Sequence, residues 1–242
     1  MRIFNNCIEM IEETYRELWK RGQTVFDKTV QGKIVSEEEY EQKELICYNF
    51  RVDDFSDLSE MLDLARKNFN YKHLHINVAK EWLKDMTTNN TLTEKWWNMT
   101  DYSKKYFKEF CEEANGKASY SYGERIIPQL DGLYKRLESN KYSRGALISL
   151  NINDDINRIG RRIPCTNSYH FIARPTIDGD KLNLIVFQRS SDAINFFPLD
   201  FAKAVLFLKF VCEKVNMNPG FVSMIINSLH LYKKDVINIY KW

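Results

Sequence analysis

The chain has 242 residues, of which 44% are hydrophobic and 14% aromatic, so it can bury a sizeable core. Lys and Arg number 35 against 33 Asp and Glu, and a formal net charge of +2 gives no bulk field that would attract nucleic acid or a membrane surface. Any anionic ligand must therefore be bound by specific residues.

The opening residues are acidic where a secretory signal needs positive and then apolar side chains, and the most apolar later stretch, AVLFLKFVC, is short and contains Lys209. We therefore expect a cytoplasmic protein with neither a membrane nor a nucleic acid as partner. His73 and His75 lack nearby carboxylate or cysteine partners, so no metal site is expected. The five cysteines are scattered and form no CxxC pair, which is typical of neither a disulfide scaffold nor a zinc module: Cys7, Cys47, Cys111, Cys165 and Cys212.

Hydrophobic periodicity predicts an N-terminal half dominated by helices. Helical spacing of apolar residues covers 5–20, 56–69 and roughly 74–84, and residues 44–52 alternate as a strand does. Residues 86–121 lack clean periodicity, which favours loops with a short helix over 101–113.

From Ser143 onward the pattern changes to that of a buried sheet. The runs RGALISLNI, CTNSYHFIAR and KLNLIVFQRS are apolar and β-favouring, and turn residues separate them. A helix over 201–215 and a last strand within FVSMIINSLHLY follow. Since neither a linker nor a repeat interrupts the chain, we interpret residues 1–242 as a single mixed α and β domain.

Two neighbouring strands carry the candidate chemistry. Cys165 directly follows a proline at the start of one predicted strand, and Gln188, Arg189 and Ser190 end the next. A guanidinium beside a hydroxyl suits an anion such as phosphate, and an arginine near a thiol favours the thiolate. Each feature alone has a simpler interpretation, because most cysteines are small buried hydrophobes and most such strand ends are solvated.

Together, PCTNSYHF, QRSSDAINFFPLDFA and SLHLY resemble the motifs of the thymidylate synthase superfamily, which read PCH before an aromatic-rich strand, QRSxDxxLGxPFN and HxY. The resemblance covers residues 143–235 and extends upstream through FDKTV, the KEWL helix, the KWW pair and the YG of Tyr122 and Gly123. It implies an α/β (α+β) fold in which a mixed β-sheet is flanked by helices, and a homodimer that forms through the sheet.

Two departures from the synthase motifs are similar to the phage deoxycytidylate hydroxymethylases. Thr166 replaces the histidine after the nucleophile, and Asp200 replaces the asparagine of PFN. An amide matches uracil, whereas a carboxyl group can accept from the amine of cytosine and share a proton with its ring nitrogen. The alternative is that Asp200 is a solvated cap of a helix that begins at Phe201.

The resemblance implies a covalent mechanism that uses 5,10-methylenetetrahydrofolate as co-substrate. Addition of the Cys165 thiolate to carbon 6 of a pyrimidine makes carbon 5 nucleophilic toward the one-carbon unit. Hydride would then give a methyl group, and water a hydroxymethyl group. Glu81 is the candidate that positions this water, unless it is an ordinary exposed helix residue.

Further roles follow from the resemblance residue by residue. The phosphate would bind Arg189, Ser190, Lys28 and, from the partner subunit, Arg144, while His230 and Tyr232 would bind the sugar. Asp192 would contact the folate, and Trp97 or Trp96 would stack near it. The substrate-binding residues expected are thus Lys28, Arg144, Gln188, Arg189, Ser190, Asp200, His230 and Tyr232, with Cys165, Glu81 and Asp200 as the catalytic set.

The expected reaction is hydroxymethylation of a pyrimidine nucleoside monophosphate, specifically of dCMP to 5-hydroxymethyl-dCMP. A dCMP or CMP methyltransferase, a dUMP hydroxymethylase and a nucleotide-binding pseudoenzyme are the alternatives. The synthases continue well past the HxY motif, so a chain that ends at Trp242 is expected to close its site differently, which favours hydration over hydride transfer.

Overall fold

The computed structural model describes residues 1–27, 29–30, 33–34, 41–69, 71, 73–88, 121–155, 157, 163–233 and 235. Within this part of the chain, six strands follow one another across a mixed sheet in the order β1-β5-β10-β8-β7-β6, with β2 paired to β5 and β9 paired to β10. These strands are β1 (Arg2–Phe4), β2 (Gln23–Phe26), β5 (Glu41–Val52), β6 (Leu147–Ser149), β7 (Thr166–Thr176), β8 (Gly179–Gln188), β9 (Ser191–Asp192) and β10 (Asn218–Tyr232). A separate small hairpin pairs β3 (Thr29–Val30) with β4 (Lys33–Ile34).

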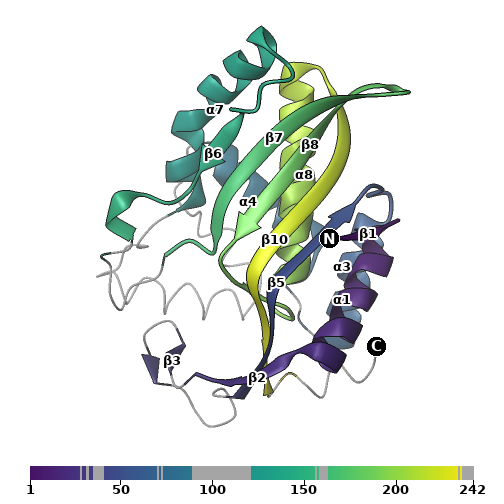
Figure 1. Cartoon of the computed structure of the whole chain (residues 1–242), viewed down its shortest axis with the longest axis vertical. Coiled ribbons are helices and arrows are strands. Elements are labelled where there is room, and N and C mark those ends of the chain that lie inside the picture. Colours follow the sequence, from purple (N-terminus) through teal and green to yellow (C-terminus); the bar gives the residue numbers. More distant parts are fainter. Residues whose placement is uncertain are drawn as a thin grey trace.

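Helices flank the sheet, and α8 and α4 lie behind strands β7, β8 and β10 in the view of Figure 1. The helices are α1 (Cys7–Arg21), α3 (Leu58–Phe69), α4 (Ile76–Thr87), α7 (Tyr122–Ser139) and α8 (Phe197–Val215), with a short 3₁₀ turn, η1 (Asn153–Asp155). The predicted fold class, a mixed sheet flanked by helices, is confirmed. Among the described residues, no helix is long and apolar enough to cross a membrane.

Helix α8 is the central packing element because it is apolar around most of its circumference. Phe201 packs against Phe50 of β5 with ring centroids 5.8 Å apart. Phe207 meets Tyr169 and Phe171 of β7 edge-on at 5.1 and 5.4 Å. These contacts fix the position of the helix relative to the sheet, and with it the position of its first turn.

The start of α8 differs from its predicted start at residue 201. The helix begins at Phe197, and Pro198 stands in the first turn, where its missing N–H costs no hydrogen bond. The sequence FPLD is therefore the first turn of the helix. Asp200 consequently lies inside the helix.

Strand β10 changes the face that it buries along its length. Val222, Met224 and Ile226 are buried, but beyond them the buried residues are Leu229 and Leu231. The change lies opposite Cys47 of β5, whose φ of 55° interrupts the regular pleat between the pairs Ile46–Ser228 and Tyr48–Ile226. As a result, His230 and Tyr232 leave the core and become half-buried.

The remaining strands and helices that the sequence predicts within the described residues are present with small shifts at their ends. Helix α7 was not predicted, although Ser121 and Glu124 form the capping box that its sequence signature, S-x-x-E, encodes. The helix expected over 101–113 lies outside the described residues.

Candidate active site

Several of the predicted site residues lie near one another at one end of the sheet. Strand β8 ends at Gln188, which pairs with Thr166 at the start of β7. Beyond that pair, the Arg189 amide donates to the Cys165 carbonyl at 2.8 Å, and the Ser228 amide of β10 donates to the Arg189 carbonyl at 3.2 Å. Backbone hydrogen bonds therefore hold the Cys165, Arg189 and Ser228 segments side by side.

The Cys165 thiol is half-buried and has two side-chain donors nearby. Arg189 Nη2 lies 3.7 Å and Ser190 Oγ lies 3.8 Å from its Sγ atom. The sequence predicted a cysteine, an arginine and a serine close to one another, and the structure brings these three side chains together. Hydrogen-bond donors in this position suit a sulfur that carries negative charge during nucleophilic attack.

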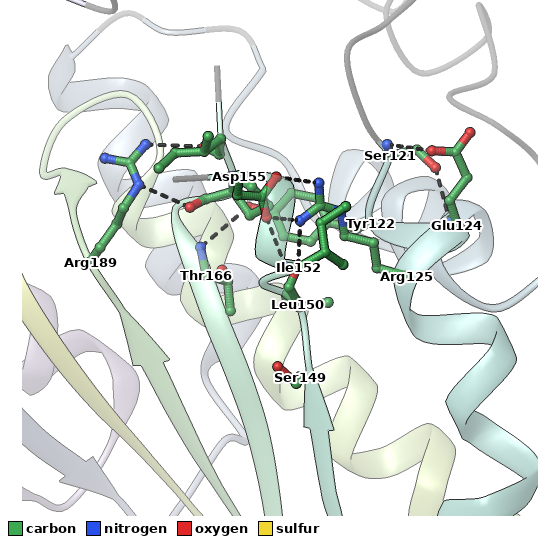
Figure 2. Close-up of polar contacts among 12 residues, drawn as sticks. Ser121, Tyr122, Glu124, Arg125, Ser149, Leu150, Ile152, Asp155, Thr166 and Arg189 are labelled. Atoms are coloured by element: carbon green, nitrogen blue, oxygen red, sulfur yellow. Dashed lines mark hydrogen bonds and ion pairs between the residues drawn. The ribbon is translucent and has the colours of Figure 1, made fainter. Parts of the chain in front are cut away.

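The Arg189 guanidinium also braces the segment that leads into Cys165. Its Nε donates to the Pro164 carbonyl at 2.9 Å and its Nη2 to the Ile163 carbonyl at 3.1 Å. Figure 2 draws these bonds as dashed lines that leave the guanidinium of Arg189. Its Nη1 donates to Ser190 Oγ at 3.2 Å. A guanidinium has five N–H groups, and most of those of Arg189 already donate to these atoms and to Cys165 Sγ. Only a minority of its N–H groups is therefore open to an incoming anion unless the side chain rearranges.

A side chain that was not predicted supports the same arginine. Asn167 Oδ1 accepts from the Arg189 amide at 3.0 Å, across the gap between two strands. Asn167 follows Thr166 in the CTN segment, and nothing in the sequence distinguishes its role from that of an ordinary strand residue.

Asp200 lies in the first turn of α8 with a side chain that is only 9% exposed. Helix α8 has Phe196 at its N-cap position and no side-chain cap, so the interpretation of Asp200 as a solvated helix cap is wrong. Three donors instead surround the carboxylate. Its Oδ2 atom lies 3.1 Å from Gln188 Nε2 and 3.3 Å from Ser191 Oγ, and its Oδ1 atom lies 2.7 Å from Lys203 Nζ.

Gln188 presents an acceptor that has no partner among the described residues. Its Nε2 atom donates to Asp200 and, at 3.1 Å, to the Thr166 hydroxyl, so the amide orientation is fixed by an acceptor-only carboxylate. Its Oε1 atom is buried without a hydrogen bond. Leaving such an atom unpaired costs about 1–3 kcal/mol, so this oxygen remains open to a hydrogen-bond donor from outside the described residues.

Lys203 was not predicted as part of the site. It lies one helical turn after Asp200, and its side chain is 2% exposed. Its Nζ atom is 3.0 Å from the centroid of Trp82 on α4 and 5.4 Å from that of Tyr122 on α7. The i,i+3 spacing of an acid and a base in a run of apolar helix residues, DFAKAVLFL, was the available signal.

Tyr122 links α7 to the start of β7. Its hydroxyl accepts a hydrogen bond from the Thr166 amide at 3.4 Å, a contact drawn in Figure 2. Burial, together with the charges of Cys165 and Asp200, raises the pKa of Tyr122 well above its ordinary value. The phenol is therefore neutral and acts as a hydrogen-bonding group.

His230 and Tyr232 lie next to the same end of the sheet. Their rings pack edge-on with centroids 5.6 Å apart, as expected for residues two apart on one strand face. The His230 carbonyl accepts from the Ala193 amide at 2.7 Å, and His230 pairs with Asp192 across β9 and β10. The structure thus brings the HxY and QRS motifs together.

Asp192 has a local structural role. Its Oδ1 atom accepts from the amides of Ile194 and Asn195 at 3.1 and 3.0 Å, and its Oδ2 atom accepts from Asn195 Nδ2 at 2.8 Å. These bonds form the turn that leads into α8. A contact of Asp192 with folate remains a prediction, and the carboxylate would have to make it in addition to these bonds.

The other predicted residues are less closely tied to Cys165. Glu81 is half-buried on α4 and forms no hydrogen bond or ion pair with another described residue. Arg144 is exposed before β6, and its carbonyl lies 2.9 Å from His170 Nε2. Lys28, Trp96 and Trp97 lie outside the described residues.

A second unpredicted ion pair lies near the start of β7 (Figure 2). Arg125 of α7 and Asp155 of η1 have side chains 7% and 6% exposed, and two contacts join them, one of them 2.8 Å from Nη2 to Oδ1. Asp155 also accepts from the Ile152 amide at 3.0 Å, and the cluster lies beside Tyr122 and Thr166 in Figure 2. The pair fixes the chain between β6 and β7 against α7.

Cysteine reactivity distinguishes the site from the core. Burial raises the pKa of Cys7 far above its ordinary value and that of Cys212 to about 12, so both thiols stay protonated at pH 8. We expect iodoacetamide at pH 8 to alkylate Cys165 and the exposed Cys47 but neither Cys7 nor Cys212, as measured by peptide mass spectrometry. Alkylation of all four at equal rates in the folded protein would contradict this arrangement.

Comparisons with known proteins agree with the fold and the motifs. The sequence matches the thymidylate synthase family over residues 48–241. A Methanosarcina barkeri protein that is named a candidate thymidylate synthase is 28% identical over 160 residues, which cover 63% of this chain and 71% of that protein. Thymidylate synthase of Mycoplasma genitalium is 21% identical over 190 residues, which cover 74% of this chain and 64% of that enzyme.

The structural likeness covers nearly the whole chain. The solved structure of thermostable thymidylate synthase A from Bacillus subtilis superposes with a TM-score of 0.70 at 16% identity, over 97% of this chain and 82% of that one. At this identity the superposition shows a common fold. Because the family match spans more than half of its residues, the chain belongs to the thymidylate synthase family.

Proposed function

We propose that this protein is a folate-dependent hydroxymethyltransferase that acts on a cytidine monophosphate, specifically dCMP, through a covalent bond to Cys165. Membership of the thymidylate synthase family supports one-carbon transfer to a pyrimidine nucleotide. The observation that carries the choice of base is the pair of acceptors formed by the Asp200 carboxylate and the unpartnered Gln188 Oε1 atom.

The base edge that fits these acceptors is rich in donors. The amine on carbon 4 of cytosine has two N–H groups, one for Asp200 and one for Gln188 Oε1. Uracil has a carbonyl oxygen in that place, which would face acceptors and leave buried lone pairs unmatched. Such a mismatch is expensive, so the two side chains favour cytosine.

The chemistry begins at Cys165. Its thiolate adds to carbon 6 of the ring, the ring electrons move to carbon 5, and carbon 5 forms a bond to an electrophilic one-carbon unit. The co-substrate 5,10-methylenetetrahydrofolate supplies that unit in this proposal. Arg189 and Ser190 lie close enough to Sγ to stabilise its charge and to orient it.

The fate of the one-carbon unit decides between two products. Water added to the exocyclic methylene group gives a hydroxymethyl group and regenerates the thiolate, whereas hydride gives a methyl group. We propose that Glu81 positions the water, because α4 also carries Trp82, which packs against Lys203 and Tyr122 beside Cys165. A carboxylate can act as general base in this step.

Substrate binding is proposed to use polar side chains from the strand ends that neighbour Cys165, together with two further cations. Arg189 and Ser190 are proposed to bind the phosphate, and His230 and Tyr232 the sugar hydroxyl, from the neighbouring strand end. Lys28 and the partner subunit's Arg144 are proposed to add positive charge at the phosphate.

A homodimer formed through the open face of the sheet is part of this proposal. That face carries Leu147, 49% exposed, and Ile225, 36% exposed, together with the half-buried Ile172, Ile185 and Phe187. The Nε2 atom of His170, which projects from this face, lies 2.9 Å from the Arg144 carbonyl oxygen, and this contact supports the proposal that Arg144 reaches a second copy. An apolar face of this kind favours a protein partner.

We expect a mass twice the 28.8 kDa of one chain in sedimentation equilibrium. Ile225→Asp would place a charge in the apolar interface and raise the dimer dissociation constant by about tenfold or more. Ile177→Asp is the control, because Ile177 is fully exposed in the turn between β7 and β8. A monomer at micromolar concentration would contradict the dimer.

Cys165→Ala tests the nucleophile. It should reduce turnover by at least about a thousandfold, because no other group forms the covalent bond, while the dissociation constant for dCMP changes little. Steady-state kinetics and calorimetric titration measure the two quantities. Cys47→Ala is the control and should leave both unchanged. A Cys165→Ala variant with substantial turnover would show that another residue is the nucleophile.

Asp200→Asn tests the choice of base. The mismatch costs about 1–3 kcal/mol, so the ratio of kcat/KM for dCMP to that for dUMP should fall by about tenfold to a hundredfold. The exposed Asp178→Asn change is the control, and thermal unfolding checks that the variant remains folded. An unchanged ratio would mean that Asp200 does not contact the base.

The same assay identifies the product. Hydroxymethylation leaves tetrahydrofolate, whereas methylation oxidises it to dihydrofolate, which absorbs differently in the near ultraviolet. Dihydrofolate formed in step with nucleotide consumption would identify a methyltransferase. Nucleotide binding without either product, and without exchange of a tritium at carbon 5, would identify a pseudoenzyme.

A further inference from the structure

Lys203 is a buried cation that the proposed chemistry does not yet use. Its Nζ atom lies 2.7 Å from Asp200 Oδ1, and the two side chains are 2% and 9% exposed. The groups that face it come from several elements. They are Asp200 on α8, Trp82 on α4, Tyr122 on α7 and Cys165 before β7.

Burial of an ammonium group is costly unless its partners compensate. Burial lowers the pKa of Lys203, and the charge of Asp200 opposes that shift. The ring face of Trp82 supplies a further favourable contact at 3.0 Å. This lysine therefore depends on an ionised Asp200, and Asp200 in turn has a fixed positive charge at one oxygen.

The other neighbours of Asp200 act in the same direction. Gln188 Nε2 and Ser191 Oγ both donate toward its second oxygen, and hydrogen bonds to a carboxylate favour its charged form. Tyr122 is a neutral phenol here, so it adds no second negative charge beside Asp200. Among the described residues, Lys203, Gln188 and Ser191 thus all present a positive charge or a hydrogen-bond donor to the Asp200 carboxylate.

The charge state of Asp200 determines what it can recognise. A neutral carboxylic acid offers one donor and one acceptor, and it can match either cytosine or uracil by exchanging the two. An ionised carboxylate offers acceptors only. With Gln188 Oε1 beside it, the site then matches a base edge made entirely of donors, which is cytosine with a proton on its N3 atom.

We propose that Lys203 is a positioning residue that keeps Asp200 ionised, so that the site binds cytosine protonated at N3 and rejects uracil, an inference that rests on the function proposed above. The proton comes from solvent when the nucleotide binds, and it returns to solvent on release. A protonated N3 withdraws electrons from carbon 6, which makes that carbon more susceptible to attack by the Cys165 thiolate.

The test measures the protonation state of bound dCMP directly. Protonation at N3 shifts the ultraviolet absorption of cytosine to longer wavelength, and the Cys165→Ala background prevents a covalent adduct from obscuring this signal. We expect dCMP bound to Cys165→Ala to show the shift, and its affinity to fall as the pH rises from 6 to 9, because binding takes up a proton. If dCMP bound to Cys165→Ala shows the absorption spectrum of unprotonated cytosine, the inference is overturned.

Lys203→Met in the same background removes the charge with little change in volume. We expect the absorption shift to disappear and the dCMP to dUMP affinity ratio to fall by about tenfold or more. Lys203→Arg, which retains the charge, should preserve both. Lys209→Met is the matched control, because Lys209 is exposed on the same helix.

The outcomes separate three explanations. If Lys203→Met weakens both nucleotides equally and retains the shift, Lys203 is only structural and the inference is wrong. If thermal unfolding shows that Lys203→Met does not fold, Lys203→Gln, which can still donate to Asp200, gives the same comparison. If Cys165→Ala binds dUMP in preference to dCMP, or binds neither nucleotide, the proposed function fails before Lys203 is tested.

Discussion

The parallel pairing of β8 with β10, next to the antiparallel pair of β7 and β8, is the constraint on which the site depends. It places the end of β8, the end of β10 and the start of β7 at the same end of the sheet. Segments distant in sequence, from Cys165 to Tyr232, therefore meet without long connections. The first turn of α8 reaches the same end because its aromatic side chains pack on β5 and β7.

Much of this arrangement could be predicted from local patterns. The strands around Cys165 and Arg189 have apolar, β-favouring sequences, and the resemblance of the three motifs to those of the thymidylate synthase superfamily implied that their polar residues share a site. The start of α8 was misplaced because FPLD contains a proline, which usually indicates a break and here occupies a permitted first-turn position. The S-x-x-E signature at Ser121 is a helix-start signal from which α7 could have been predicted.

The rest depends on contacts between distant residues. Nothing near Lys203 in the sequence indicates that Trp82, 121 positions earlier, provides the ring on which its ammonium group lies. The same holds for Arg125, which pairs with Asp155 thirty positions later. The change of buried face in β10 is also invisible locally, because it depends on the backbone of Cys47 in the neighbouring strand.

Arg189 has a further consequence for how substrate and nucleophile are connected. Its guanidinium is bonded to the carbonyls of Ile163 and Pro164, the two residues before Cys165. Any anion that draws the guanidinium toward itself must compete with those carbonyls, so a shift of the guanidinium would also disturb the backbone that carries the thiol. A ligand that lacks a phosphate would leave the hydrogen bonds from Arg189 to these two carbonyls unaltered. If Arg189 binds the phosphate as proposed, a nucleotide and a nucleoside would differ in their effect on the position of the sulfur as well as in affinity.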